Sequence, residues 1–472
     1  MQSITDHCIM RAAEMPMGTP KMPALIVGAG ACGQTAAIRL RQFGVDCLML
    51  ERDALPSGST ALSSGFIPAA ETDLQKSLSI QDSVEQFRED IIAKSGGQAA
   101  RHLVEVYTDG VTEAINAFCQ HGIAFEIIDG FLYPGHRALR MHAVPQRTGD
   151  ALLAAIGQMA QEMGADLIVQ ARVTELWVSN DNTIMGIGYL RPDGKKERIG
   201  CDALLLSCNG FGGNPQMVKD LLPEMSDALF AGHVGNDGSA ITWGQQLGAA
   251  LEDLGAYQGH GSWVVPQGVL MTWAPMTAGA VQINKLGKRF HNELAGYSEA
   301  AVQVLKQPGR YCWNVFDQPL LEMARTFPDF IQAEKSGALK IAENLKELGG
   351  VIDCPLEALE ETFRLIAPES VDQFGRTFSR SLQPPFFAVK VTGALFHTQG
   401  GLSIDSDCRV LSQRHEPFPN LWAAGGAARG VSGSAVWGYL SGNGLLSAVG
   451  GGWIAATSMA SQLTASRKDR VQ

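Results

Sequence analysis

The stretch Pro23-Ala-Leu-Ile-Val-Gly-Ala-Gly-Ala-Cys-Gly33, with Glu51 beyond it, decides the fold of this chain. Its pattern predicts an apolar strand over residues 24–27, a glycine-rich turn, and a helix over about residues 31–43. A second apolar strand is predicted over residues 45–50. A strand, a turn, a helix and a strand in this order form the opening unit of a doubly wound α/β sheet.

The three glycines of the turn and the later acidic residue each have a physical role. Gly28 permits the tight turn, Gly30 lets a pyrophosphate approach the backbone, and Gly33 lets the helix pack closely on the strand. The helix N-terminus supplies free N–H groups and the positive end of the helix dipole, and Glu51 can accept hydrogen bonds from an adenosine ribose. A tight turn without a ligand is the alternative, but the surrounding strand–turn–helix–strand pattern favours a dinucleotide site.

The length and composition describe a folded protein with more than one domain. The chain has 472 residues, of which 45% are hydrophobic and 18% are charged, so it can build a large core. The formal net charge of −11 argues against a nucleic-acid partner or an anionic membrane surface, because both favour clustered Lys and Arg. No apolar run approaches the roughly 20 residues that a membrane span needs.

The N-terminal residues and the cysteines indicate in which cellular compartment the protein is expected. Residues 1–20 mix charged and small residues without an apolar stretch, so we expect a flexible tail there and no signal peptide. The nine cysteines include no CxxC pair and no metal-ligand spacing, and their odd number suits free thiols in a reducing compartment. These features predict a cytoplasmic protein without a metal site.

The position of the glycine motif favours FAD over an exchanging nicotinamide cofactor. The motif lies near the N-terminus, and a long chain follows it before any second nucleotide signature. This arrangement suits a flavin ring that needs contacts from distant segments. Residues 57–65 form a small-residue loop after the second strand, where N–H groups and hydroxyls can reach a flavin and its phosphates; a flexible linker is the alternative.

Further strands run into glycine-rich turns. Residues 171–178 and 184–190 are predicted to pair as neighbouring strands. Residues 201–207 form an apolar strand that ends in a glycine turn, and residues 420–426 repeat this pattern. A helix that opens at residues 442–444 would aim N–H groups at the flavin and stabilise the negative charge of its reduced form.

Seven motifs in chain order carry a family resemblance: GAGACG (28–33), GSTALSSG (58–65), SCNGFGGN (207–214), GNDGSA (235–240), GKRFHNE (287–293), HTQGGL (397–402) and SGNGLLSA (441–448). On these motifs the chain resembles, over residues 23–460, the FAD-dependent fumarate reductase and succinate dehydrogenase flavoprotein superfamily. The resemblance is strongest to the branch of 3-ketosteroid dehydrogenases and cyclohexanone-type dehydrogenases. It implies an α/β architecture with a Rossmann-like FAD-binding domain built from residues 21–237 and 376–472, and an inserted α+β capping domain at residues 238–375.

The motifs and the resemblance together predict a non-covalent FAD site. The loop over residues 58–65 lacks the histidine that holds the flavin covalently in membrane-bound succinate dehydrogenases. The predicted cofactor-binding residues are Gly28, Gly30, Ala31, Cys32, Gly33, Glu51, Arg52, Ser59, Thr60, Ser63, Ser64, Gly65, Val173, Asn209, Gly210, Asp237, Gly425, Gly426, Asn443 and Leu445.

The departures from the fumarate reductase pattern point to the chemistry. Fumarate reductases carry a proton-donating arginine four residues after the Glu of their RF-x-NE motif, but the residue four after Glu293 here is Tyr297. Ketosteroid dehydrogenases also place a tyrosine there, as a base. A second arginine of fumarate reductases, which grips a substrate carboxylate, falls near Tyr439. His397 and Thr398, which contact a substrate carboxylate in fumarate reductases, are retained.

Dehydrogenation of a ketone at its alpha and beta carbons needs a polarised carbonyl, a base and a hydride acceptor at flavin N5. We predict that Tyr297 is the base and that Tyr439 donates a hydrogen bond to the substrate oxygen. Tyr133 resembles a third site tyrosine of the ketosteroid enzymes, and His397 is a candidate to bind a ketone or carboxylate. A free phenol has a pKa near 10, so a catalytic tyrosine needs nearby charge or hydrogen bonds that favour the phenolate. An ordinary packed aromatic is the alternative at each position.

Polar residues elsewhere bear on the substrate. Arg137 and Arg140 follow Tyr133 in a loop that contains Gly and Pro, and a guanidinium can bind a carboxylate through two parallel hydrogen bonds. A solvated surface arginine is the alternative. Thr398 and Gly442 complete the predicted substrate-binding residues.

Other basic residues near the motifs are expected to differ in role. Arg429 is a further candidate for a cation near the flavin or the substrate. Lys285, Lys288 and Arg289 are expected to flank a turn on the cap surface. Residues 341–366 have helical spacing with mixed charges, so we expect exposed cap helices there.

We therefore expect an FAD-dependent oxidoreductase that acts on CH–CH groups and introduces a double bond beside a cyclic ketone. A carboxylate-bearing ring such as an oxo-cyclohexanecarboxylate is one form of the substrate. The first alternative is an enone or enoate reductase of fumarate reductase type, and the second is an electron-transfer flavoprotein subunit. The chain has no CxxCH haem motif and no iron–sulfur cysteine spacing, so an external electron acceptor is required, whose identity is open together with the oligomeric state.

Overall fold

The apolar strands predicted at the two ends of the chain meet in one sheet in the computed structural model, which describes residues 7–366, 368 and 371–471. Nine strands from these residues follow the order β1-β8-β9-β10-β2-β3-β7, with β21 and β20 added beside β10. The strands of this sheet are β1 (Cys8–Arg11), β2 (Lys21–Val27), β3 (Cys47–Leu50), β7 (Asp166–Ile168), β8 (Arg172–Val178), β9 (Ile184–Leu190), β10 (Lys196–Leu206), β20 (Arg409–Leu411) and β21 (Pro417–Ala423).

The strands that carry the predicted glycine turns end at one edge of this sheet. β10 lies between β2 and β21 and is parallel to both, and β3 is parallel to β2. The Ser207 N–H donates to the Val27 carbonyl at 2.9 Å, and the Ala424 N–H donates to the Leu206 carbonyl at 3.1 Å. The turns after the three strands therefore lie side by side, at the sheet edge where α/β proteins bind ligands.

Helices and two small sheets surround the nine-stranded sheet, and α1 packs against α6 and α16. The helices are α1 (Ala31–Gln42), α2 (Gly58–Ala61), α3 (Asp73–Ser77), α4 (Val84–Lys94), α5 (Arg101–Gln120), α6 (Gly149–Glu162), α7 (Pro215–Leu221), η2 (Pro223–Met225), α8 (Ser239–Leu247), η4 (Gly425–Ala427), η5 (Val436–Gly438), α15 (Asn443–Leu445), the π-helical turn η6 (Leu446–Gly450) and α16 (Gly451–Val471). The small sheets are β4 (Ile67–Pro68) with β5 (Glu126–Ile127) and β6 (Met141–Ala143), and β12 (Leu251–Glu252) with β19 (Gly401–Leu402).

The expectation of a flexible tail over residues 1–20 is wrong within the described part of the chain. β1 is a parallel edge strand that pairs with β8, with Cys8 opposite Glu175. The Ile9 N–H also donates to Gln246 Oε1 at 3.1 Å. Residues 1–6 lie outside the described residues. The short, mixed sequence of β1 shows no periodic pattern of apolar residues that would predict a strand. It forms a strand because it pairs with β8.

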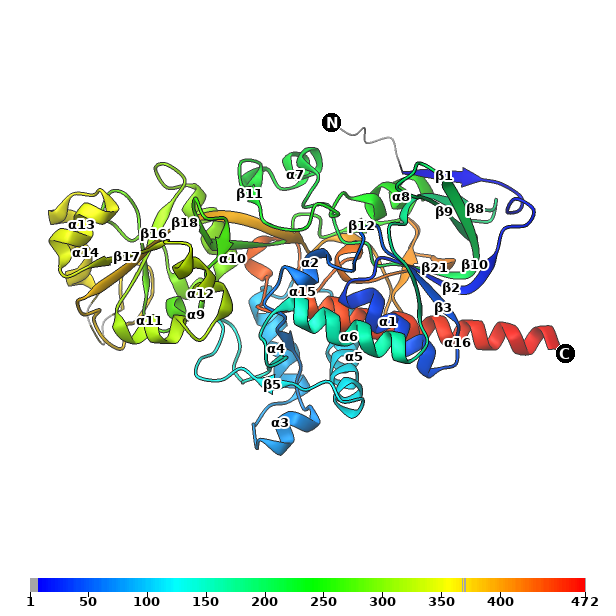
Figure 1. Cartoon of the computed structure of the whole chain (residues 1–472), viewed down its shortest axis with the longest axis horizontal. Coiled ribbons are helices and arrows are strands. Elements are labelled where there is room, and N and C mark those ends of the chain that lie inside the picture. Colours follow the sequence, from blue (N-terminus) through cyan, green and yellow to red (C-terminus); the bar gives the residue numbers. More distant parts are fainter. Residues whose placement is uncertain (1–6, 367, 369–370, 472) are drawn as a thin grey trace.

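The cap is a second lobe beside the lobe of the nine-stranded sheet (Figure 1). Its seven-stranded sheet contains β11 (Leu229–Phe230), β13 (Tyr257–Val264), β14 (Val269–Leu270), β15 (Val281–Ile283), β16 (Cys312–Phe316), β17 (Leu339–Ala342) and β18 (Phe386–Thr398). Its helices are α9 (Ala274–Thr277), η3 (Glu293–Ala295), α10 (Tyr297–Leu305), α11 (Gln318–Ala324), α12 (Pro328–Lys335), α13 (Leu345–Ile352) and α14 (Leu356–Leu365). The predicted cap helices over residues 341–366 correspond to α13 and α14.

The cap sheet extends beyond the predicted boundaries at residues 238 and 375. β18 follows residue 375, yet it pairs with β13, β16 and β17, and almost all of its residues are buried. At the other boundary, α8 packs through Trp243 and Leu247 into the core of the FAD-type lobe. The pairing of distant strands, and not local composition, decides where the cap begins and ends.

Arg289 is not on the cap surface, contrary to expectation, but in a buried ion cluster. Its guanidinium pairs with Glu293 at 2.6 Å and with Asp372, and Arg376 pairs with the same Glu293 oxygen at 2.6 Å. Although burial alone would raise the pKa of Glu293, the two guanidiniums hold it at about 2. The cluster joins the RF-x-NE motif to the segment before β18.

None of the helices in the described part of the chain combines the length and the apolar character required to cross a membrane.

Candidate functional site

A cavity follows the edge where β2, β3 and β10 end. The turn after β2, the end of β3, α2 and the start of β8 contribute its walls. Its lining residues are His7, Val27, Gly28, Gly30, Ala31, Cys32, Leu50, Glu51, Arg52, Gly58, Ser59, Thr60, Ala171, Arg172, Val173, Ser207, Cys208, Asn209, His233, Gly235, Asp237, Ser239, Trp243, Gly425, Gly426 and Ala448.

The N-terminus of α1 opens onto this cavity without a side-chain cap. Gly28 has a φ of +102°, and a Cβ there would lie 2.6 Å from the Ser207 carbonyl oxygen. A Cβ on Gly33 would lie 2.0 Å from the Gly28 carbonyl oxygen, so only glycine allows α1 to pack this closely on the turn. The Ala31 N–H donates to Thr60 Oγ1 at 3.2 Å. An uncapped helix start of this kind is suited to a phosphate group.

Glu51 is buried at the end of β3 and already holds two backbone groups. Its Oε2 accepts from the Ala29 N–H and its Oε1 from the Asp53 N–H, each at 3.1 Å. Burial raises the pKa of Glu51. Each carboxylate oxygen has a second lone pair, so Glu51 can still accept a hydrogen bond from a ribose hydroxyl.

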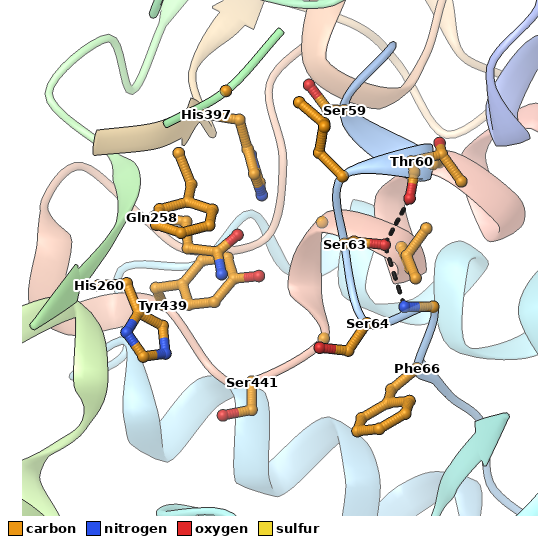
Figure 2. Close-up of a pocket in the computed structure, with 18 of the residues that line it drawn as sticks. Ser59, Thr60, Ser63, Ser64, Phe66, Gln258, His260, His397, Tyr439 and Ser441 are labelled. Carbon is orange, nitrogen blue, oxygen red and sulfur yellow. Dashed lines mark hydrogen bonds between the residues drawn. The ribbon is translucent and has the colours of Figure 1, made fainter. Parts of the chain in front are cut away.

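A larger cavity adjoins the first and shares Ser59, Thr60, Asn209, Gly425, Gly426 and Ala448 with it. Figure 2 shows the loop from Ser59 to Phe66 on one side of this cavity, with His260, His397 and Tyr439 across from it. Ser63 Oγ stiffens the loop, because it donates to the Thr60 carbonyl at 2.7 Å and accepts from the Gly65 N–H at 3.1 Å.

Buried polar atoms without partners show that the two cavities fit a polar ligand. Within the described part of the chain, His7 Nδ1 and Trp243 Nε1 in the first cavity and Ser447 Oγ in the second have no hydrogen-bond partner. A buried polar group that stays unpaired is costly, so these atoms indicate ligand contacts. A long ligand with a phosphate-bearing middle and a ring at one end, such as FAD, matches this shape and these donors.

Most of the predicted cofactor residues line one of the two cavities. Those that line the first are Gly28, Gly30, Ala31, Cys32, Glu51, Arg52, Ser59, Thr60, Val173, Asn209, Asp237, Gly425 and Gly426. Those that line the second in addition are Ser63, Ser64, Gly65 and Leu445.

Three predicted cofactor residues do not line either cavity: Gly33 and Gly210 have packing roles, and Asn443 has a buried Oδ1 without a hydrogen-bond partner among the described residues. Gly33 allows the close approach of α1. Gly210 faces Thr398, whose Oγ1 would lie 1.9 Å from an added Cβ. Asn443 is fully buried, and its Nδ2 donates to Ser432 Oγ at 2.9 Å.

The structure brings Tyr133, Tyr297, Tyr439 and His397 to the walls of the larger cavity. Tyr297 is the first residue of α10, and its ring centroid lies 6.0 Å from that of Tyr439 and 6.4 Å from that of Tyr133. His260 of β13 stacks on the Tyr297 ring at 4.7 Å. Residues from the cap and from the FAD-type lobe thus share one aromatic wall.

The site tyrosines are neutral in the protein alone. Burial raises the pKa of Tyr297 to about 12, although hydrogen bonds with the Ser441 and Tyr439 hydroxyls oppose the rise. Burial raises the pKa of Tyr439 and of Tyr133 further. The two hydroxyl partners make Tyr297 the phenol in this wall whose charged form is best supported.

His397 at the end of β18 is also neutral. Its Nδ1 lies 3.1 Å from Gln399 Nε2 and 3.2 Å from the Thr398 carbonyl oxygen, and burial lowers its pKa to about 4. Gln399 is held by Ser432, whose Oγ donates to Gln399 Oε1 at 3.0 Å. Because the protein engages Nδ1, Nε2 is the nitrogen left for a ligand. It faces Gly444, where a Cβ would approach it to 2.7 Å.

The predicted substrate-binding arginines are not in the cavity, which corrects the sequence interpretation. Arg140 is buried and binds Asp82 at 2.9 Å and Asp90 at 2.7 Å. Arg137 binds Glu89 at 2.7 Å and also Asp90. Both arginines tie the loop after Tyr133 to the region of α4, and their acidic partners lie about 50 residues away in sequence, beyond any local signal.

Two further expectations are corrected in the same way. Thr398 does not line the cavity, because its Oγ1 accepts from the Phe211 N–H at 3.2 Å in the protein interior. Arg429 pairs with Glu252 at 2.9 Å and Asp253 at 2.6 Å and is likewise absent from the lining. Gly442 does line the larger cavity, with a φ of +90°.

Several lining residues were missed. Gln258, His260, Thr272, Trp273 and Asp329 reach the larger cavity from the cap and belong to no sequence motif, whereas Gln399 and Ser441 lie within the HTQGGL and SGNGLLSA motifs but were not assigned to the site. The lining includes no Lys or Arg from the described residues, and Asp329 is its one acidic side chain. An alternation of polar residues along β13, at Gln258 and His260, is the only local hint of this wall.

Comparison with known proteins agrees with this geometry. The family model "FAD binding domain" matches residues 24–445. The probable fumarate reductase Ifc3 of Shewanella frigidimarina (strain NCIMB 400) is 26% identical to this chain, over 92% of this chain and 74% of that protein. Among solved structures, the open conformation of a flavocytochrome c3 fumarate reductase has a TM-score of 0.79 and 25% identity, and covers 94% of this chain and 79% of that chain.

A solved 3-ketosteroid-Δ4-(5α)-dehydrogenase from Rhodococcus jostii RHA1 has a TM-score of 0.77 and 24% identity, and covers 96% of this chain and 99% of that chain. The predicted superfamily and the α/β fold are therefore confirmed. FAD is the cofactor, and the protein is an FAD-dependent oxidoreductase that acts on carbon–carbon bonds.

Proposed function

We propose that this chain, which belongs to the FAD binding domain family, removes two hydrogens from neighbouring carbons of an uncharged cyclic ketone. One observation carries the proposal: tyrosines wall the cavity beside the flavin loop, and no Lys or Arg of the described residues lines it. A carboxylate substrate needs a cation to replace its lost hydration, whereas a ketone needs only hydrogen-bond donors. The solved ketosteroid dehydrogenase with a similar fold supports the same chemistry.

Different residues of the aromatic wall activate different atoms of the ketone. The Tyr439 hydroxyl donates to the substrate carbonyl and stabilises the negative charge that develops on its oxygen. The Tyr297 oxygen takes the proton from the alpha carbon, and the Ser441 hydroxyl, which remains bonded to Tyr297 while Tyr439 donates to the substrate, favours the charged form of Tyr297. When bound, FAD supplies a hydride acceptor for the beta carbon. The neutral His397 orients the ring through Nε2.

The carboxylate-bearing form of the substrate loses its support in this geometry. It depended on Arg137, Arg140, His397 and Thr398. The structure pairs the two arginines with carboxylates and buries Thr398, and His397, which does line the cavity, is neutral because burial lowers its pKa to about 4. The remaining carboxyl in the cavity, Asp329, would repel an acid group of the substrate when it is charged. We therefore propose a neutral ring.

Reduction of an enone is the second candidate, and one observation favours it. Tyr297 has a pKa raised to about 12, so it is protonated at neutral pH and could give a proton to the alpha carbon. Relatives named as reductases also match the chain, among them a urocanate reductase of Eggerthella lenta that is 24% identical over 86% of this chain and 70% of that protein. An electron-transfer subunit has no need of the aromatic cavity.

The acceptor of the electrons is an external carrier that the chain does not specify.

All nine cysteines are free, which supports the prediction of a reducing compartment such as the cytoplasm.

Anaerobic mixing of the oxidised holoenzyme with cyclohexanone, a 3-ketosteroid and 4-oxocyclohexanecarboxylate tests the proposal through the flavin absorbance. We expect a neutral ketone to bleach the flavin, and Tyr297→Phe to slow bleaching by about 10²- to 10⁴-fold, the usual contribution of a general base. Tyr311→Phe is the matched control, because Tyr311 lies under the Lys390 ammonium and not in the cavity lining.

If no ketone bleaches the flavin but an enone rapidly reoxidises the chemically reduced enzyme, the reaction runs as a reduction. If neither compound reacts, the electron-transfer alternative holds. Equal bleaching rates for Tyr297→Phe and the native protein would remove Tyr297 from its role as base.

A further inference from the structure

One carboxyl group in the larger cavity has no part in the proposed reaction. Asp329 is the second residue of α12, and its Oδ1 accepts from the neighbouring Phe330 N–H at 2.7 Å. Its side chain opens onto the cavity. Burial and backbone hydrogen bonds account for its pKa shift, and no charged side chain among the described residues contributes to it. The carboxyl therefore faces the cavity without a cation to balance it.

The surroundings of Asp329 combine an apolar wall with two hydroxyl groups. Phe327, just before α12, packs against Phe131 at 5.9 Å, and Phe131 packs against Tyr133 at 4.9 Å. The Tyr133 hydroxyl is hydrogen-bonded to the side chain of Thr272, which also lines the cavity. Asp329, Tyr133 and Thr272 line the same cavity, and the charge of Asp329 acts on Tyr133, because it helps to raise the pKa of that phenol.

We infer that Asp329, Tyr133 and Thr272 form a subsite for a hydroxyl group carried by the ketone substrate. The inference rests on the proposed function, since it concerns the substrate of the same cavity. A hydroxyl both donates and accepts, so it satisfies the carboxylate of Asp329 and one of the two hydroxyls together. An ammonium could donate to the same oxygens, but it would lose its hydration against an otherwise aromatic wall, and a carboxylate only accepts and would face the carboxylate of Asp329. The neutral hydroxyl is therefore the group that fits this surface.

The subsite selects the substrate more sharply than apolar packing could. When a cavity holds a polar group meant for a substrate hydroxyl, an analogue without the hydroxyl leaves that group unpaired. The partners that the described residues give Asp329 are backbone N–H groups, and no cation is among them to replace the hydroxyl of the substrate. We expect a preference of about 10- to 100-fold for the hydroxyl-bearing ketone, as for hydrogen bonds to charged groups.

The experiment compares three probes that differ at one position: 4-(hydroxymethyl)cyclohexanone, 4-ethylcyclohexanone and 4-oxocyclohexanecarboxylate. The native holoenzyme should bind the hydroxymethyl ketone about 10- to 100-fold more tightly than the ethyl ketone, measured both as KM and as Kd from the perturbation of the oxidised flavin spectrum. In Asp329→Asn this ratio should fall to within about 3-fold of unity. The carboxylate should bind better to Asp329→Asn than to the native enzyme, because a charge repulsion is gone.

Asp353→Asn is the matched control, since Asp353 is an exposed cap residue at the end of α13 and should leave the ratio as it is in the native enzyme. Equal affinity of the native enzyme for the hydroxymethyl and ethyl ketones would overturn the subsite, as would an unchanged ratio in Asp329→Asn. The spectral Kd needs no turnover, so the subsite is tested even if the proposed dehydrogenation fails. An intact flavin spectrum in each variant shows that the cavity is still formed.

Discussion

Asp329 couples the protonation of one cavity carboxyl to the stability of the whole protein. Burial raises its pKa from the usual 3.8 to about 7, so between these pH values the folded protein holds a proton that the unfolded chain has lost. The contribution of Asp329 to the free energy of unfolding should therefore fall as the pH rises from about 4 to 7. Burial lowers the pKa of His260 to about 3 and that of His397 to about 4, both from 6.5, so these two histidines contribute with the opposite sign, and the contribution of Asp329 is obtained from the difference between the native protein and a variant at this one position.

Asp329→Asn removes this dependence, because an amide does not titrate. We expect the variant to exceed the native protein in unfolding free energy by an amount on the order of 2 kcal/mol at pH 8 and to equal it near pH 4, since one pKa unit corresponds to about 1.4 kcal/mol and solvent in the cavity screens part of the effect. Thermal unfolding of both proteins at the two pH values measures it. A difference of the same size at pH 4 and pH 8 would contradict the assignment.

At the level of single residues, the sequence identified site residues that lie near a local motif. It missed residues whose role depends on partners that are distant in the sequence. Tyr297 and Tyr439 could be placed because each lies at a fixed spacing from a recognisable motif, Tyr297 after GKRFHNE and Tyr439 before SGNGLLSA. Arg140 could not, since its carboxylate partners Asp82 and Asp90 are brought to it only by the fold. Asp329 belongs to no sequence motif, and only its position in the lining of the larger cavity identifies it.

The ion cluster around Glu293 ties η3 to the segment between α14 and β18. Arg289 and Arg376 bind its carboxylate inside the cap, and their charges hold its pKa at about 2. We predict that Glu293→Gln lowers the free energy of cap unfolding by about 3–5 kcal/mol, because it leaves two buried guanidiniums without their shared partner. Glu360→Gln, on the exposed face of α14, is the control. Urea unfolding followed by tryptophan fluorescence measures the change.

The contribution of Glu293 to the free energy of unfolding depends on pH with the opposite sign to that of Asp329. Because the pKa of Glu293 is lowered in the folded state, its contribution is complete above the usual value of 4.5 and is lost as the pH falls from 4.5 towards 2. The acid limb of the unfolding curve should flatten in Glu293→Gln. An unchanged acid limb would show that other carboxylates set it.

Elements were predictable where the sequence is periodic by itself. The run β2–α1–β3 agrees with its prediction to within a few residues, and β8, β9 and β21 occur where apolar alternation placed them. β1 is a strand only because it pairs with β8, and β18 belongs to the cap only because it pairs with β13, β16 and β17. Pairing of this kind is decided in three dimensions.

The two cavities span the junction of the lobes, so the cofactor should stabilise the molecule as a whole. The first cavity is built from the turns after β2 and β10, and the second also includes α10, α12 and β18 of the cap. A ligand at 100 times its Kd adds about 2.7 kcal/mol to the free energy of unfolding. We expect removal of FAD to lower the Tm, and added FAD to restore it with a dependence on FAD concentration. A Tm that ignores FAD would contradict a binding site at this junction.

β18 gives this junction a further property. Its first residues pair with β16 and β17 in the outer lobe, its last residues carry His397, and Figure 1 shows the strand running from that lobe to the middle of the molecule. Directly beyond it, a Cβ on Gly400 would lie 2.0 Å from the Asp253 carbonyl oxygen, so the chain is clamped there. Any movement of the cap relative to the FAD-type lobe must then bend the chain within two or three residues of His397. The movement that admits a ligand therefore also changes the position of His397 relative to the other reacting groups. A substitution on the cap far from the cavity would consequently change kcat.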